Sequence, residues 1–537
     1  MTHDYVIVGA GSAGCILAAR LSESGKHSVL LLEAGGRDDS FWFRIPVGYA
    51  RSYYNPRVNW MYWSEPEAAL GGRRIYCPRG KVQGGSGSIN AMVFVRGAAA
   101  DFDDWAAAGN PGWAYDDVLP AFRKLESYAG GASDWHGGDG PIHVTPMRGG
   151  THAVTDAYLA ACRELQLPAN GDFNGASIEG AGVYDVNTHE GRRSSSSVEY
   201  LHPALGRRNL TVERDAQALR VVLDDTGRAT GVEIRRGSET RIVTAKREVI
   251  LAAGAVDTPK LLQLSGIGDG MVLAGAGVAV ARHLPAVGRN LQDHLCASFY
   301  YRSRVPTLNG DFGSLLGQAR LGLRYLLTRK GPFAMSVNQA GGFFRGAPGE
   351  PRPNIQMYFN PLSYRIPDSP KAGLKPEPYP GFLLAFNSCR PTSRGEIAIA
   401  SPDPSAAAKI RPNYLSTDRD IAEVLQGSRL ARRIMAAPSL AAITMEEMPP
   451  SAGAESDEAL LDWFRANSGS IYHLCGSCAM GPDPATAVVD ARLWVHGVPG
   501  LRVVDASIFP NITAGNINAP TMMVAEKGAE MMLADAG

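Results

Sequence analysis

Residues 4–25 read DYVIVGAGSAGCILAARLSESG, and this stretch decides the fold expected for the amino-terminal part of the chain. An apolar run from Tyr5 to Val8 precedes Gly9, Gly11 and Gly14, and apolar side chains with helical spacing follow. The first glycine permits a tight turn, the second lets a pyrophosphate approach the backbone, and the third lets the helix pack on the strand. The stretch therefore predicts a strand, a phosphate-binding turn and a helix whose N-terminus faces the phosphates.

The stretch SVLLLEAG at 28–35 predicts a second strand, which ends at Glu33. A carboxylate about 20 residues after such a glycine turn typically accepts hydrogen bonds from the adenosine ribose. Strand, glycines, helix, strand and acid in this order predict a dinucleotide site. They do not distinguish NAD from FAD.

The size and charge of the chain limit the classes of function. Its 537 residues are too many for one ordinary hydrophobic core, so two domains, or one domain with a large insertion, are expected. Lys plus Arg and Asp plus Glu both number 53, so the formal net charge is zero. Without a basic field the chain is not expected to bind nucleic acid or anionic lipid, and the expected partner is a small molecule.

Cysteine usage and the N-terminus indicate the compartment. The seven cysteines are odd in number and scattered, which argues against a disulfide framework and for a reducing environment. The apolar run at the N-terminus breaks at Gly9 and no basic segment precedes it, so neither a signal peptide nor an integral membrane segment is expected. These features predict a cytoplasmic location.

Three further segments are expected to complete the nucleotide-binding unit. CPRGKVQGGSGSINAMVFVRG at 77–97 is a loop rich in Gly and Ser that runs into an apolar stretch, which suits a loop packed over a flat cofactor. REVILAAGAVDTPKLLQLSGIG at 247–268 predicts a strand and a helix. LRVVDASIFPNITAGNINAPTMMVAEKGAEMM at 501–532 predicts strand, loop and helix, with Asp505 at the end of the strand. The unit is thus assembled from pieces that lie far apart in the chain.

The stretch SGSIYHLCGSCAMG at 468–481 places His473 beside Cys475 and Cys478. Three kinds of chemistry could use these residues: a metal site, a redox dithiol, or a histidine base with the cysteines as packing. Zinc needs about four ligands, and no second Cys/His pair follows at suitable spacing, so no metal is expected. The dithiol and the base stay open from these residues alone.

The middle of the chain, 306–464, has a different pattern. NIQMYFNP at 354–361 and GFLLAFNSCRP at 381–391 alternate with a period of two and are separated by Pro and Gly turns, which predicts an antiparallel sheet. Aromatic side chains such as Tyr358 and Phe359 could line a pocket there or simply form core.

Taken together, the five segments at 4–25, 77–97, 247–268, 468–481 and 501–532 resemble the glucose-methanol-choline (GMC) oxidoreductase family over nearly the whole chain. The resemblance implies an α/β fold with a Rossmann-like FAD-binding domain and a second, α+β domain built on an antiparallel sheet. The FAD-binding domain is expected to be discontinuous and to comprise 1–155, 195–305 and 465–537. The substrate-binding domain is expected to comprise 156–194 and 306–464.

The resemblance also implies how the flavin is held. Some relatives attach FAD covalently through a histidine just before the loop asparagine, whereas here Ile89 precedes Asn90, so the FAD is expected to be non-covalent. The residues expected to bind the cofactor are Gly9, Gly11, Ser12, Ala13, Gly14, Glu33, Ala34, Gly85, Ser86, Asn90, Ala91, Val93, Ala218, Asp505, Ala506, Asn516, Ile517 and Thr521.

Two residues are expected to be catalytic. His473 corresponds to the family's histidine that lies over flavin N5 and acts on the substrate hydroxyl, and imidazole, with an ordinary pKa of about 6.5, suits proton removal near neutral pH. Asn516 stands where many relatives have a second histidine. Its amide can hydrogen-bond a developing alkoxide but cannot carry a proton; alternatively, it satisfies a turn.

The activity expected from the resemblance is FAD-dependent oxidation of a small primary or polyol-like alcohol to the aldehyde or ketone, by hydride transfer to flavin N5. The chain resembles bacterial members described as choline, sorbose or polyethylene-glycol dehydrogenases. Two alternatives stay open: a lyase of the same fold, similar to hydroxynitrile lyases, that keeps FAD as structure, and an NAD-linked dehydrogenase. The expected electron acceptor is a quinone, a dye-like acceptor or O2, and no oligomeric state is predicted.

Overall fold

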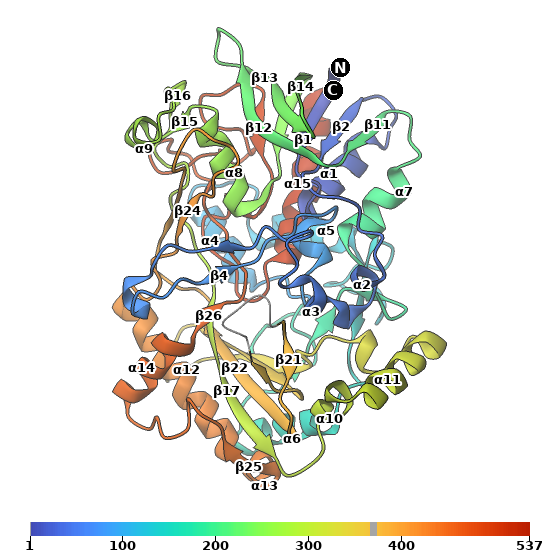
Figure 1. Cartoon of the computed structure of the whole chain (residues 1–537), viewed down its shortest axis with the longest axis vertical. Coiled ribbons are helices and arrows are strands. Elements are labelled where there is room, and N and C mark those ends of the chain that lie inside the picture. Colours follow the sequence, from blue (N-terminus) through green and yellow to red (C-terminus); the bar gives the residue numbers. More distant parts are fainter. Residues whose placement is uncertain (1, 366–372) are drawn as a thin grey trace.

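The computed structural model describes residues 2–365 and 373–537 and contains two large sheets, which lie one above the other in Figure 1. The first sheet begins with four parallel strands in the order β11-β2-β1-β14: Leu210–Glu213, Val29–Leu32, Thr2–Val8 and Glu239–Leu251. β14 also pairs antiparallel with β13 (Ala229–Arg236), which pairs with β12 (Ala216–Leu223). β27 (Leu501–Val503) joins the far end of β14 in parallel.

The predicted strand, turn and helix at the N-terminus are confirmed. α1 (Ser12–Ser22) follows β1, and every residue of β2 is buried, as expected for a parallel strand covered on both faces. The two distant segments also fold as predicted, because α8 (Gly254–Leu264) follows β14, and β27 leads toward α15 (Asn518–Ala536). α15 packs against α1, so the two ends of the sequence share one core.

The second sheet is antiparallel, as predicted, with the order β25-β17-β22-β19-β18-β7. Its strands are Thr444–Glu447, Leu295–Ser303, Gly381–Ser388, Ile355–Asn360, Ala340–Phe344 and Gly180–Val183, and β26 (Gly469–Ser470) pairs with β17. The domain boundaries stay a prediction. β17 and β26, which those boundaries assign to the FAD-binding domain, pair within the second sheet, and this supports a boundary before residue 295.

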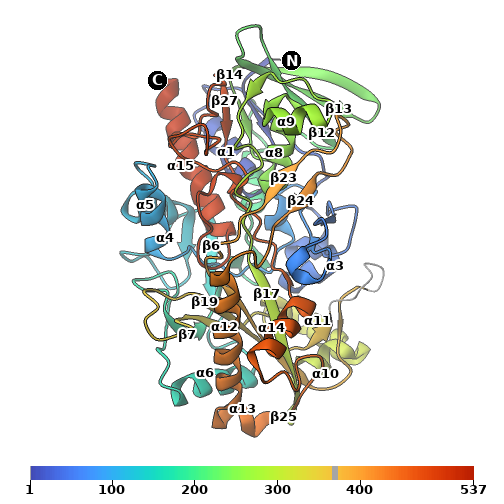
Figure 2. The ribbon, with the colours of Figure 1, turned by 90° about the vertical axis from the view of Figure 1, so that its left-hand side faces the viewer.

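The two faces of the second sheet have different roles because side chains alternate along a strand. One face packs under α6 (Ala153–Glu164), α12 (Asp418–Ala436) and α14 (Asp457–Asn467), and Phe359 is among its core residues. Tyr358, its neighbour, points to the other face and lines a large cavity between the sheets. Figure 2 shows α12 and α14 covering the outer side of this sheet. None of the helices in the described ranges combines the length and the apolar composition needed to cross a bilayer.

Candidate active site

A cavity of about 1130 Å³ lies between the first sheet and the inner face of the second. It brings together all but one of the residues predicted to bind the cofactor or the substrate, although they come from segments spread over more than 500 positions. The predicted residues that line it are Gly9, Gly11, Ser12, Ala13, Glu33, Ala34, Gly85, Ser86, Asn90, Ala91, Val93, Ala218, His473, Asp505, Ala506, Asn516, Ile517 and Thr521. Gly14 is the exception.

The surroundings of Gly14 and Gly11 suit the roles predicted for them. A Cβ at Gly14 would lie 1.9 Å from the carbonyl oxygen of Gly9, so only glycine lets α1 pack so closely on β1. A Cβ at Gly11 would have one neighbour within 4 Å, at 3.9 Å, so the backbone is open on the side that faces the cavity. No side chain caps the N-terminus of α1, which leaves its amides and the positive end of its dipole for an anion.

The carboxylate of Glu33 lies at the end of β2, as predicted, and its side chain is held in place by the backbone. One oxygen accepts a hydrogen bond from the amide of Ala10 at 2.9 Å and the other accepts one from Gly35 at 2.8 Å. Burial raises the pKa of Glu33 to about 7. Each oxygen keeps a second lone pair, so the carboxylate can still accept hydrogen bonds from ribose hydroxyls. These features fit the adenosine half of FAD.

The loop predicted to pack over the flavin is held by Arg193, which sequence reasoning misses. Its guanidinium donates to Oδ1 of Asn90 at 2.6 Å, to the carbonyl of Asn90 at 2.7 Å and to the carbonyl of Gly87 at 3.1 Å. Ile89 lines the cavity beside Asn90, and its hydrocarbon side chain has no atom that could bond covalently to a flavin. The loop therefore fits a flavin that is bound by contact alone.

Asp505 lines the cavity and also anchors the C-terminal segment. Its carboxylate accepts hydrogen bonds from the Gly254 amide at 2.8 Å, the Thr258 hydroxyl at 2.6 Å and the Ser507 amide at 2.8 Å. Nearby, the Ser12 hydroxyl donates to Oδ1 of Asn518 at 2.7 Å, which ties the start of α1 to the start of α15. Two helix N-termini thus meet at the cavity.

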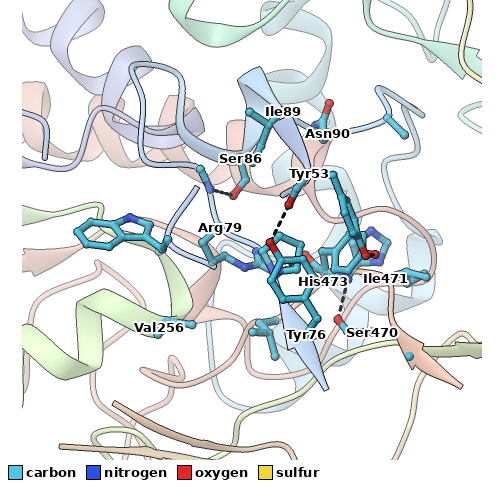
Figure 3. A pocket seen from close by; sticks show the side chains of 18 of the residues that line it. Tyr53, Tyr76, Arg79, Ser86, Ile89, Asn90, Val256, Ser470, Ile471 and His473 are labelled. Carbon is cyan, nitrogen blue, oxygen red and sulfur yellow. Dashed lines mark hydrogen bonds between the residues drawn. The ribbon is translucent and has the colours of Figure 1, made fainter. Parts of the chain in front are cut away.

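The backbone around His473 turns the imidazole into the cavity. Tyr472, directly before it, has φ of +73°, a left-handed conformation that non-glycine residues rarely adopt. The amide of His473 donates to Oδ1 of buried Asp293 at 2.8 Å, and Arg79 donates to the carbonyl of Tyr472. Figure 3 shows His473 among Tyr53, Tyr76 and Arg79. The strained turn is therefore held at both ends by polar side chains.

His294, which sequence reasoning also misses at the site, determines which nitrogen of His473 carries a hydrogen. Nε2 of His294 lies 2.9 Å from the carbonyl oxygen of Cys389 and must donate to it, because a carbonyl only accepts. Nδ1 of a neutral His294 is then an acceptor, so Nδ1 of His473, 2.9 Å away, donates to it. Nε2 of His473 is left without a hydrogen, and Nδ2 of Asn516 donates to it at 3.2 Å.

The electrostatics keep both imidazoles neutral. Burial lowers the pKa of His294 to about 4. Burial, the neighbouring His294 and the positive charge of Arg79 hold the pKa of His473 well below its ordinary value of about 6.5. At neutral pH, Nε2 of His473 is therefore unprotonated at the cavity wall, and it can accept a proton from a bound alcohol that replaces the Asn516 amide as its hydrogen-bond donor.

The cysteines of the same stretch have no sign of redox or metal chemistry. All seven cysteines of the chain are buried and unpaired. Burial raises the pKa of both Cys475 and Cys478 well above its ordinary value, so the reactive thiolate is disfavoured. Within the described ranges, no group of three possible metal ligands includes His473 or either cysteine. The base with packing cysteines is the interpretation that fits these facts.

One group of possible metal ligands lies elsewhere, formed by His143, His189 and Glu199, whose ligand atoms lie within 4.8 Å of one another. The two imidazole rings are stacked, with centroids 3.7 Å apart and planes at 13°. An ion lies in the plane of each imidazole that binds it, and two nearly parallel planes do not meet at one ion. This geometry suits ring stacking and not shared coordination.

Aromatic side chains dominate the cavity wall near His473. Tyr53 contacts Tyr54, Tyr76 and Tyr472, with ring centroids 4.5, 5.3 and 5.5 Å away. The ring centroid of Trp63 lies 5.0 Å from that of Tyr76, and Trp63 also lines the cavity. These residues come from four segments, so nothing in their local sequence indicates that they share a wall.

Comparisons with known proteins agree with this site. The family model of the GMC oxidoreductase matches residues 3–296 and 391–525 in two parts. An oxygen-dependent choline dehydrogenase of Photobacterium profundum is 42% identical, over 99% of this chain and 93% of that protein. The crystal structure of pyridoxine 4-oxidase from Mesorbium loti has 31% identity and a TM-score of 0.88 over 98% of both chains. A structure of Aspergillus oryzae formate oxidase, solved to study FAD modification, has 25% identity and a TM-score of 0.90 over 99% of this chain and 98% of that one.

These matches confirm the predicted two-domain fold, the cofactor FAD and the oxidation of an alcohol, and they do not favour the lyase or the NAD-linked alternative. The chain belongs to the family of GMC oxidoreductases.

Proposed function

We propose that the chain oxidises a small primary alcohol, with choline as the first candidate, and that Nε2 of His473 removes the hydroxyl proton. One observation carries this proposal: the hydrogen-bond chain from the Cys389 carbonyl through His294 to His473. It leaves Nε2 unprotonated on the cavity side of the ring, where an alcohol would bind.

Different residues of the cavity suit different parts of FAD. The open backbone at Gly11 and the uncapped N-terminus of α1 suit the pyrophosphate, and Glu33 suits the ribose. The loop that Arg193 holds, with Ile89 and Asn90, suits the flavin ring, and the start of α15 closes the site from the other side. When bound, FAD accepts the hydride that leaves the alcohol carbon.

The proton transfer follows from the geometry around His473. As the hydroxyl proton moves to Nε2, the O–H and C–H bonds of the alcohol break and a carbonyl forms, so the alcohol loses two electrons and two hydrogens in total. The Nδ1–H group of His473 stays hydrogen-bonded to neutral His294, which stabilises the new positive charge. Nδ2 of Asn516, next to Nε2, can donate to the alkoxide that develops on the substrate oxygen.

The aromatic wall supports choline as the substrate. A quaternary ammonium has no hydrogen to donate and is recognised by the faces of aromatic rings, each such contact contributing about 0.5–2 kcal/mol. Tyr53, Tyr54, Tyr76, Tyr472 and Trp63 line the cavity close to His473, and Glu377 adds a carboxylate to the lining. The choline dehydrogenases that match the whole chain support the same choice.

Anaerobic stopped-flow spectroscopy of the FAD-loaded protein tests the proposal. Choline should bleach the flavin, and the uncharged isostere 3,3-dimethylbutan-1-ol should do so with a second-order rate constant at least about tenfold lower, because it lacks the cation that the rings attract. Pyridoxine, an aromatic primary alcohol, is the control suggested by the structural relative. Faster bleaching by pyridoxine or by the isostere would exclude choline while leaving alcohol oxidation intact.

The electron acceptor and the cellular location stay predictions. The predicted acceptor is a quinone, a dye-like acceptor or O2, since a reduced flavin passes electrons to each of these.

A further inference from the structure

Helix α11 (Leu315–Thr328) carries an apolar surface that the rest of the chain does not cover. Five leucines are largely exposed: Leu315 (87%), Leu316 (82%), Leu323 (59%), Leu326 (56%) and Leu327 (75%). Figure 1 shows α11 at the edge of the molecule, beside α10 (Leu308–Gly313). Exposed leucines grouped on one helix mark a surface for interaction.

An ordinary surface helix turns its apolar face toward the protein, whereas α11 turns most of its apolar side chains toward solvent. Its buried residues are Gly317, Leu321 and Tyr325, spaced four apart, so a single narrow face touches the protein. At 3.6 residues per turn, the five exposed leucines fall on the opposite side of the helix. The leucine stripe therefore points directly away from the fold.

Basic residues flank this stripe. Arg320 and Arg324 lie within the helix and Arg329 and Lys330 follow its end, whereas α11 contains no acidic residue. The nearest acid in sequence, Asp311 of α10, pairs with Arg320 at 2.5 Å. The net charge of the whole chain is zero, which by itself argues against attraction to anionic lipid. At this end of α11, however, positive charge is concentrated locally.

The helix also adjoins the wall of the active-site cavity. Phe312 of α10 packs in a small apolar cluster with Tyr49 and Tyr364, which both line the cavity. Phe312 stacks on Phe333, which lies 6.4 Å from the ring of Tyr325 on α11. A surface that binds the leucine stripe would therefore lie near the cavity wall that Tyr49 and Tyr364 form.

We propose that α11 docks the protein reversibly on an anionic lipid surface, with its leucines in the headgroup region and Arg324 and Lys330 against lipid phosphates. Leucines on one face, basic residues at its edges and no acid are the features of a helix that lies in a membrane interface. A stripe of one helix is too small for a stable protein interface. Its 14 residues are about 21 Å long and about 10 Å wide, far below the roughly 800 Å² per partner that such interfaces bury.

Vesicle co-sedimentation with the full-length, FAD-loaded protein tests the proposal. Wild-type protein should bind vesicles of phosphatidylcholine with one quarter phosphatidylglycerol, and should bind pure phosphatidylcholine vesicles at least about tenfold less. The triple variant Leu323→Ser, Leu326→Ser, Leu327→Ser should lose most binding to the anionic vesicles. The pair Arg324→Gln and Lys330→Gln should weaken binding and reduce its dependence on salt.

Matched controls separate docking from folding. The variant Ile242→Ser, Met271→Ser, Met445→Ser removes three exposed apolar side chains from other elements and should bind vesicles like the wild type. Flavin content, melting temperature and flavin reduction by alcohol should be equal in all variants. Absence of wild-type binding to anionic vesicles, or full binding by the leucine variant, would overturn the proposal. It would also fall if light scattering showed a dimer that the leucine variant converts to a monomer, because the stripe would then be a contact between copies.

Discussion

Nδ1 of His294 accepts a hydrogen bond from Nδ1 of His473 at 2.9 Å, although the two residues are 179 positions apart in the chain. Because the other nitrogen of His294 donates to the Cys389 carbonyl, this contact selects the tautomer of His473 whose Nε2 carries no hydrogen. A buried histidine that does not line the cavity thus prepares the proposed base for its reaction.

Replacing the proposed base should separate chemistry from folding. His473→Ala should keep its FAD, and flavin reduction by substrate should slow by about 10² to 10⁴-fold, the range expected when a positioned proton acceptor is lost. Asn516→Ala should slow it less, since it removes one hydrogen-bond donor and leaves the acceptor. Stopped-flow bleaching measures both, and a His473→Ala protein that reduces its flavin at the wild-type rate would exclude this residue from the mechanism.

The pH dependence follows from the lowered pKa of His473. The neutral imidazole is the active form, so the rate constant for flavin reduction should rise with pH only below pH 6.5 and stay constant from neutral pH upward. His473→Ala should lack the acidic limb. A wild-type rate that still rises between pH 7 and 9 would assign the ionisation to another group.

The role of His294 as a positioning residue predicts a distinct kinetic signature. His294→Ala should slow flavin reduction by about 10 to 100-fold, which is the cost typical of losing a partner that orients a metal-binding imidazole, with little change in substrate affinity. It should also alter the acidic limb of the pH profile, which a purely structural defect would not. His496→Ala is the matched control, because His496 bonds the Gly481 carbonyl and does not line the cavity.

Burial of His294 also predicts acid destabilisation. Its pKa is about 4 in the folded protein and about 6.5 when unfolded, so between these values only the unfolded chain binds the proton. Through His294 alone, the free energy of unfolding should therefore fall by about 3 kcal/mol as the pH drops from about 6.5 to about 4. Urea denaturation with excess FAD measures this, and His294→Asn should lose much of the dependence. An equal slope in that variant would contradict the assignment.

Ile89 predicts that the flavin is released intact. Its side chain cannot form a bond to the flavin ring, so acid precipitation should leave FAD in the supernatant and a colourless pellet. Absorbance of both fractions measures the ratio. Flavin that stays with the denatured protein would show covalent attachment through another residue.

Glu33 should affect retention of the cofactor and not the choice of alcohol. Hydrogen bonds to a charged acceptor contribute about 1.5–3 kcal/mol, so Glu33→Ala should weaken FAD binding by about 10 to 100-fold. With a pKa of about 7, the carboxylate of the free protein becomes charged as the pH rises through 7, and FAD affinity should increase over the same range. Titration of apoprotein with FAD measures both effects. Unchanged affinity in Glu33→Ala would remove this residue from the ribose site, and a changed order of preferred alcohols would place it near the substrate.

The individual helices and strands could be predicted from the sequence because each depends on residues that are close together in the chain. The glycine spacing of Gly9, Gly11 and Gly14, the acid at the end of β2 and the period-two strands of the second sheet each depend on residues close together in the chain. His473 and Asn516 are predicted through the resemblance to the GMC family, which itself rests on motifs of the same kind. That they meet at 3.2 Å agrees with the motifs.

The sequence alone therefore determined the fold class and, through its resemblance to the GMC family, the cofactor FAD and the residue proposed as the base. The tertiary structure alone decided the tautomer of that base, the aromatic wall and the direction of the leucines on α11. The alternation that separates Tyr358 from Phe359 is visible in the sequence, but which of the two faces the cavity depends on where the helices pack. Likewise, His294 contacts His473 only because β17 and β26 pair, and the helical pattern of α11 does not tell which of its faces meets the protein. Each of these facts depends on contacts between distant segments, and such contacts exist only after the chain has folded.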